Sequence, residues 1–92
     1  MKIFEMLELG QAIAYTIEGG QALHIHKFGR KGLYNYKLFG HLFDQDENRL
    51  LATAKTFGVN ILVIEHKGTP KQHVDLFGKP LERIIEYVHL HN

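Results

Sequence analysis

A helix-like segment followed at once by a continuous apolar run most constrains how this chain can fold. In residues 44–58, Asp44 is a typical N-cap residue, Glu47 stands three positions later, and Gly58 occupies the place of a left-handed C-terminal residue. The apolar stripe between them consists of Leu50, Leu51, Ala54 and Phe57. Residues 59–65 then contain Ile-Leu-Val-Ile, a pattern typical of a strand buried on both faces. We therefore expect a helix capped by Asp44 and a buried strand at 59–65.

The N-terminal part of the chain fits two patterns. Apolar or small residues fall at helical spacing in residues 3–17, but β-branched and aromatic residues between glycine breaks also indicate strands. We predict an antiparallel meander with strands at 3–7, 12–17 and 22–28. Residues 29–43, punctuated by glycines, are expected to form a loop.

A parallel pair and a last helix complete the predicted fold. A strand at 22–28, a helix and a strand at 59–65 predict a right-handed β-α-β crossover that pairs the two strands in parallel. Pro80 is expected at the first position of a C-terminal helix, whose apolar stripe is Leu81, Ile84, Ile85 and Val88. The expected fold class is α+β: N-terminal antiparallel strands lead into a β-α-β crossover, and a C-terminal helix packs on the same sheet.

Length and composition exclude several classes of protein. The 92 residues provide one core, so residues 1–92 are expected to be a single domain, with a homodimer compatible with this size. The absence of cysteine excludes disulfides, a thiol nucleophile and thiolate metal sites. No apolar run approaches the roughly 20 residues of a membrane span, and the acidic N-terminal residues disfavour an export signal. We expect a cytoplasmic protein that makes no membrane contact.

Histidines provide the first candidate site. His41 precedes the expected helix, where the helix dipole favours a neutral imidazole, and His66 follows the expected buried strand, at the edge where α/β sheets bind ligands. His73 stands two residues before Asp75, a carboxylate that can orient the imidazole or share a metal with it. We predict that His41, His66, His73 and Asp75 hold a divalent metal (zinc, manganese or nickel), with His41, His73 and Asp75 as catalytic candidates. Taken singly, each histidine is better explained as structural or merely exposed, and the case for a site depends on the four residues converging.

A second pair of histidines has an ambiguous meaning. His24 and His26 are two residues apart on an expected strand and therefore point to the same face, where two imidazoles can bind one metal. Alternation of polar residues with Leu23 and Ile25 produces the same pattern without any site, and we favour that interpretation.

A basic and aromatic loop provides the second candidate site. Residues 19–43 contain no acidic residue. Their basic and aromatic side chains can bind phosphates and stack on bases; the candidates are Lys27, Arg30, Lys31, Tyr34, Tyr36 and Lys37. The alternative is a solvated loop balanced by the acidic residues that follow it.

Part of the chain resembles a known family. The residues that carry the resemblance are His41-Leu42, Asp44, Leu50, Ala54, Gly58 and the sequence His73-Val74-Asp75-Leu76. Over about residues 23–90, their order resembles the small bacterial and phage proteins grouped as domain of unknown function 4031. The resemblance implies no established activity, but it groups His41, His73 and Asp75 as one constellation.

Two functions remain open at this stage. The first and favoured one is a non-catalytic binding module, in which the basic-aromatic loop contacts an anionic partner such as nucleic acid or an acidic protein surface. The second is a metal-dependent hydrolase or phosphoesterase that uses the His/Asp cluster, with Arg30 or Lys31 steadying a phosphate. The sequence contains no complete nucleotide-binding or hydrolase motif that would decide between them.

Overall fold

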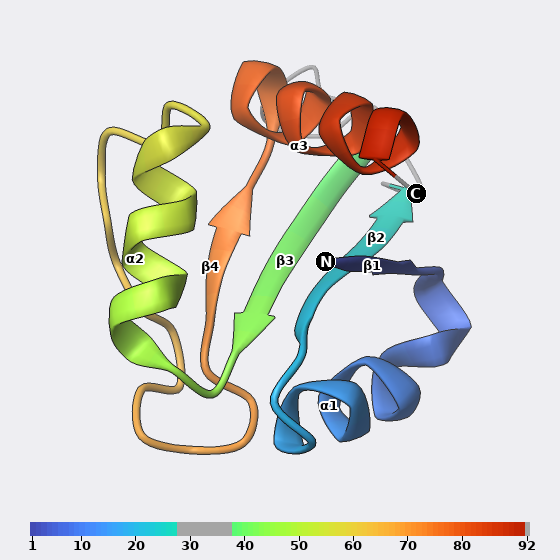
Figure 1. Cartoon of the computed structure of the whole chain (residues 1–92), viewed down its shortest axis with the longest axis vertical. Coiled ribbons are helices and arrows are strands. Elements are labelled where there is room, and N and C mark those ends of the chain that lie inside the picture. The colour runs from blue at the N-terminus through green and yellow to red at the C-terminus, as the bar shows by residue number, and fades with distance from the viewer. Residues whose placement is uncertain (28–37, 92) are drawn as a thin grey trace.

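A mixed four-stranded sheet forms the centre of the computed structural model, which describes residues 1–27 and 38–91 (Figure 1). Its strands lie in the order β1 (Lys2–Phe4), β2 (Gln21–Lys27), β3 (Leu38–Asp44) and β4 (His73–Leu76). The β1/β2 pair is parallel, and the β2/β3 and β3/β4 pairs are antiparallel. The helices are the 3₁₀ helix η1 (Met6–Glu8) and the α-helices α1 (Leu9–Ile17), α2 (Glu47–Thr56) and α3 (Gly78–His91). The predicted α+β class, with a C-terminal helix packed on the sheet, is confirmed.

The two faces of the sheet bury different residues, because successive side chains of a strand point to opposite faces. One face supplies Leu23, Leu42, Val74 and Leu76 to the main core, where α2 and α3 cover them. The close packing of α3 is visible at Gly40, where a Cβ atom would lie 2.9 Å from the Leu81 side chain. On the opposite face, α1 packs over the start of β2 through a small second cluster of Phe4, Ala12, Ala22 and Phe43. The rest of this second face bears the histidines.

The strand predicted at 12–17 is wrong, because residues 9–17 form α1. Ala12 and Thr16, four residues apart, are fully buried on one side of this helix, and Gly19 adopts the left-handed conformation just beyond it. The helix connects β1 to β2 and makes them parallel. The structure therefore contains a β-α-β unit, but it lies at the N-terminus instead of between residues 22–28 and 59–65.

The expected loop at 29–43 is also corrected, because its described end belongs to strand β3. Asp44 is the last residue of this strand, and the N-cap of α2 is Asp46, whose side chain accepts from the Arg49 backbone N–H. The predicted end of the helix is confirmed, since Gly58 follows it with φ of 98°.

The buried strand predicted at 59–65 is wrong. Ile61 is 79% exposed and Val63 53% exposed, and the segment makes only an isolated β-bridge between Glu65 and His73. Strand β4 occupies the position beside β3, and α2 and α3 already cover the apolar face, so no buried strand position remains for this run. The segment His73–Leu76 instead forms β4, a short strand at the edge of the sheet.

The C-terminal helix has the predicted apolar stripe but a different start. Leu81, Ile84 and Val88 are buried, and Ile85 packs partly against the same core. The helix begins at Gly78, so Pro80 lies within its first turn instead of at its first position.

Candidate metal centre on the open sheet face

Strand register brings the histidines together on the second face. His24 on β2 is paired with His41 on β3, and His41 is paired in turn with Asp75 on β4. One row across three strands therefore carries two imidazoles and a carboxylate, pointing to the same side. His73 and His26 lie on the same face in the neighbouring rows, opposite Phe43 and Phe39.

His41, His73 and Asp75 form one contact group. The Oδ1 atom of Asp75 lies 2.8 Å from Nδ1 of His41 and 3.1 Å from Nε2 of His73. One potential ligand atom from each of the three residues lies within 4.8 Å of the others, so the group can hold a metal ion. The predicted convergence of these residues is thus present in the structure.

The hydrogen bonds of His73 determine which of its nitrogens carries the proton. Its Nδ1 lies 2.8 Å from the carbonyl oxygen of Lys71, which can only accept, so Nδ1–H donates. A neutral His73 ring then presents the lone pair of Nε2 to the carboxylate of Asp75 at 3.1 Å. Two acceptors at this distance repel each other unless a proton or a metal ion lies between them.

His41 is held from both sides. Its Nδ1–H donates to Asp75, and its Nε2 lies 3.1 Å from Nε2 of His26. Burial is the largest cause that lowers the pKa of His41, although the hydrogen bond to Asp75 acts in the opposite direction. Burial also lowers the pKa of His26, with a further contribution from His24. Both rings are therefore favoured in the neutral form, which is the form that ligates metals.

His24 has a structural position. Its ring is only 5% exposed, and its Nε2–H donates to the carbonyl oxygen of Met6 at 3.0 Å, which fastens η1 to the sheet. Within the described residues its Nδ1 has no hydrogen-bond partner. His24 and His26 share a face as expected, but each pairs with a different group instead of forming a two-histidine site.

A hollow of about 460 Å³ opens beside the three-residue group. Leu9 and Ile13 of α1 line it, together with Glu65, His66 and Lys71 from the segment before β4. The group therefore faces a space large enough for a small molecule, with apolar and charged walls.

His66 lies next to the group but outside it. Its ring centroid is 5.8 Å from that of His73, and its backbone has a left-handed φ of 53°, uncommon for a residue other than glycine. The strand end at which it was expected does not exist. It reaches the site because Glu65, the preceding residue, is bonded to His73.

The basic-aromatic loop falls largely outside the described residues. Lys27 is the last residue of β2, paired with Leu38, whereas Arg30, Lys31, Tyr34, Tyr36 and Lys37 lie outside the part that the structure describes. Binding of an anionic partner by this loop stays a prediction.

Sequence reasoning missed the role of His26 as the partner of His41. The alternation of Phe39, His41 and Phe43 with smaller or aliphatic residues would have indicated a strand at 38–44. That strand, paired with β2, would have placed His26 beside His41.

Comparison with protein-family models, curated proteins and solved structures finds no match. The resemblance to domain of unknown function 4031 therefore stays a prediction. Among the described residues, no helix has the length and hydropathy needed to cross a membrane.

Proposed function

We propose that this protein is a metal-dependent hydrolase that binds a divalent transition-metal ion through His41, His73 and Asp75. The observation that carries the proposal is the contact between Nε2 of His73 and Oδ1 of Asp75, 3.1 Å apart. With Nδ1–H of His73 donated to the Lys71 carbonyl, a neutral His73 ring directs the lone pair of its Nε2 at a lone pair of the Asp75 carboxylate. A cation bound by both atoms would turn that repulsion into coordination.

The donor set suits zinc, manganese or nickel. Two imidazoles and one carboxylate are common ligands of these ions, with metal–ligand distances of roughly 2.0–2.2 Å for zinc. Such distances separate neighbouring ligand atoms by about 2.8–3.1 Å in octahedral geometry and by about 3.3–3.6 Å in tetrahedral geometry. The 2.8 and 3.1 Å separations at Asp75 fall within the octahedral range. The three ligand atoms as a set lie within 4.8 Å of one another, so the side chains would have to adjust to admit an ion.

The second nitrogen of each ring has a partner that supports ligation. Histidine ligands usually donate their other N–H to a neighbouring acceptor, which fixes the ring and raises its basicity. His73 donates Nδ1–H to the Lys71 carbonyl. If His41 ligates through Nδ1, its proton resides on Nε2, where His26 accepts it at 3.1 Å.

Three protein ligands leave coordination positions for water and substrate. A bound divalent ion lowers the pKa of a coordinated water and polarises an ester or phosphoryl oxygen. The hollow beside the group would admit the substrate, and the ammonium group of Lys71 on its wall would attract an anionic one. These features favour hydrolysis of a small ester or phosphoester.

The test is thermal unfolding in excess EDTA, followed by addition of zinc, manganese or nickel. At a free metal concentration 100 times the Kd, binding contributes about 2.7 kcal/mol, a rise in Tm of roughly 10–20 °C for a domain of this size. The rise should vanish in the double variant His73→Ala, Asp75→Ala and persist in His89→Ala, which removes an exposed histidine of α3. No rise with any of the three metals would contradict the proposal.

Activity needs a separate measurement. The metal-loaded protein should hydrolyse 4-nitrophenyl phosphate or 4-nitrophenyl acetate, and the double variant should not. Metal binding without hydrolysis of either ester would limit the function to metal binding.

A further inference from the structure

The outer edge of β4 is nearly unpaired. On one side β4 pairs with β3; on the other, Glu65 is the only described residue whose backbone is bonded to it, through two hydrogen bonds with His73 of 2.8 and 3.1 Å. Backbone groups of an antiparallel strand alternate in direction, so the N–H and C=O of Asp75 point to the same outer side as those of His73. Along residues 1–27 and 38–91, Asp75 has no backbone partner on that side.

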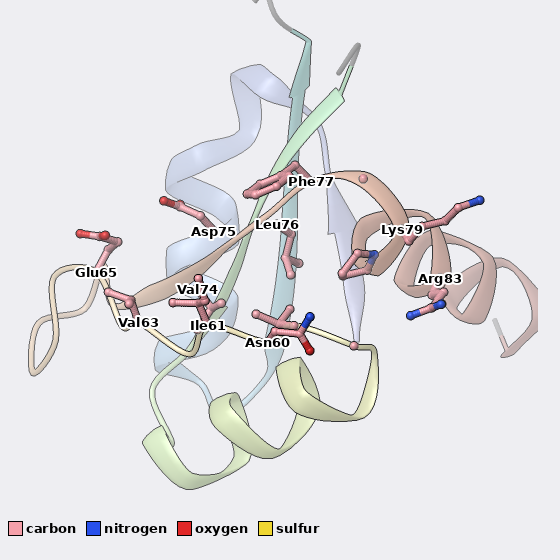
Figure 2. A pocket seen from close by; sticks show the side chains of 14 residues that line it. Asn60, Ile61, Val63, Glu65, Val74, Asp75, Leu76, Phe77, Lys79 and Arg83 are labelled. Atoms are coloured by element: carbon pink, nitrogen blue, oxygen red, sulfur yellow. The ribbon is translucent and has the colours of Figure 1, made fainter. Parts of the chain in front are cut away.

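A cleft of about 660 Å³ separates this edge from the segment before it (Figure 2). Beyond the pairing of Glu65 with His73, residues 59–64 diverge from β4 instead of continuing the ladder. Ile61 and Val63 line one wall, and Val74, Leu76 and Phe77 line the other. Ile61, Val63 and Phe77 are 79, 53 and 41% exposed, so the walls present apolar surface to solvent. The cleft thus combines free backbone groups with apolar contacts, the two requirements for adding a strand.

The two ends of the cleft carry opposite charges. Figure 2 shows the carboxylates of Glu65 and Asp75 at one end and the side chains of Lys79 and Arg83 at the other. The Lys79 side chain is 81% exposed, and its ion pair with Glu82 is long, at 3.7 Å. The cleft should therefore bind a peptide more tightly when the peptide places a basic residue near Glu65 and an acidic residue near Lys79.

We propose that this cleft binds an extended peptide segment of another protein as a fifth strand on β4. Alternate apolar side chains of the peptide pack on Ile61, Val63 and Phe77, and its backbone bonds to Asp75. The presence of a wall on both sides favours a single extended chain over the sheet edge of a second copy. In a second copy the same edge is flanked by its own residues 59–65, which would collide with those of the first. The proposal requires no bound metal.

The test starts with a random heptapeptide library displayed on phage and selected on the immobilised full chain. We expect the selected peptides to alternate apolar residues, with an acid at one end and a base at the other. A synthetic selected peptide should shift the backbone amide signals of residues 60–65 and 74–78 in NMR spectra. The same peptide with proline at its centre, which lacks an N–H donor, should bind at least about tenfold more weakly.

Variants of the protein can distinguish peptide binding in this cleft from binding at other surfaces. The double variant Lys79→Glu, Arg83→Glu should weaken binding about tenfold, since two exposed charges are reversed. Lys55→Glu, an exposed lysine on α2, is the matched control and should leave the affinity unchanged. Three outcomes would overturn the proposal: no peptide selected above background, amide shifts confined to other residues, or the same shifts appearing with protein concentration alone. The last would identify a second copy as the occupant.

Discussion

Replacement of Arg49 by methionine is expected to destabilise the fold strongly, because Arg49 neutralises a buried carboxylate. The side chain of Asp44 has no exposed surface, and both of its oxygens are bonded to Arg49: Oδ2 to Nε at 2.7 Å and Oδ1 to Nη2 at 2.8 Å. Nη2 also donates to the carbonyl oxygen of Gly19 at 2.9 Å, which joins the turn after α1 to α2. Methionine keeps the apolar stem but removes all of these donors.

The expected loss follows from the burial of the two partners. Breaking a fully buried ion pair by removing one partner costs about 3–5 kcal/mol. The Arg49 side chain is 45% exposed, so water can approach the vacated position, and Asp44 keeps donors from Gln21 Nε2 and the Asp46 N–H. We therefore expect a loss of about 2–3 kcal/mol, out of a total stability of roughly 5–14 kcal/mol for a chain of this length.

Urea unfolding followed by circular dichroism would measure this loss. The double variant Arg49→Met, Asp44→Asn should recover about 1 kcal/mol or more, because asparagine removes the uncompensated charge. Arg83→Met is the control, since Arg83 makes a single 3.3 Å hydrogen bond to the carbonyl of Phe57 and should change stability little. A loss below about 1 kcal/mol for Arg49→Met, or no recovery in the double variant, would refute this account of Asp44.

Two further predictions concern the histidines of the open face. The pKa values of His26 and His41 are lowered from 6.5 in the folded protein, so below pH 6.5 the unfolded chain binds more protons. Stability measured by urea unfolding should therefore be greatest above pH 6.5 and fall as the pH decreases through it, and the fall should be small because solvent screens both partly exposed rings. A flat profile, or a profile that His41→Gln leaves unchanged, would contradict this. Replacement of His26 by phenylalanine keeps a ring beside Phe39 but removes the partner of His41, so zinc affinity measured by calorimetry should fall roughly 10–100-fold. Unchanged affinity in His26→Phe, with His89→Phe as control, would show that His26 does not support the metal ligand.

Much of the local structure was predictable where one pattern dominated. The stripes of α2 and α3 and the left-handed Gly58 were identified because helical spacing and glycine punctuation agreed. Residues 12–17 were misassigned as a strand because β-branched residues at 13, 16 and 17 favour one. They belong to α1, a helix that buries Ala12 and Thr16. The conformational preferences of the residues in this segment could not reveal the burial of Ala12 and Thr16, because it depends on residues elsewhere in the chain.

The misassigned run at 59–65 shows a different limit. A run that is apolar at every position fits a doubly buried strand, but the short segment His73–Leu76 took the place beside β3. The position beside β3 has one face on the core and one face bearing the histidines, which suits the alternation of Val74 and Leu76 with His73 and Asp75. A single local window contains none of this information.

The candidate site was predicted as a group although the expected positions were wrong. His41 was expected at a helix start but lies within β3, and His66 was expected at a strand end that does not exist. His41, His73 and Asp75 nevertheless converge, because His73 and Asp75 share a strand face and that strand pairs with the one bearing His41. The role of His26 depended on recognising β3, most of which was expected to be a loop.

The register that assembles the site also assembles the core, and this restricts how the protein can evolve. In β3, His41 faces the open side and Leu42 the interior. Inserting or deleting one residue in the strand would exchange the two, placing an imidazole among the helices and a leucine in the hollow. Homologues of this chain can therefore change the site through single substitutions, which preserve the strand register. An insertion or deletion within β3 would instead disrupt both the site and the core.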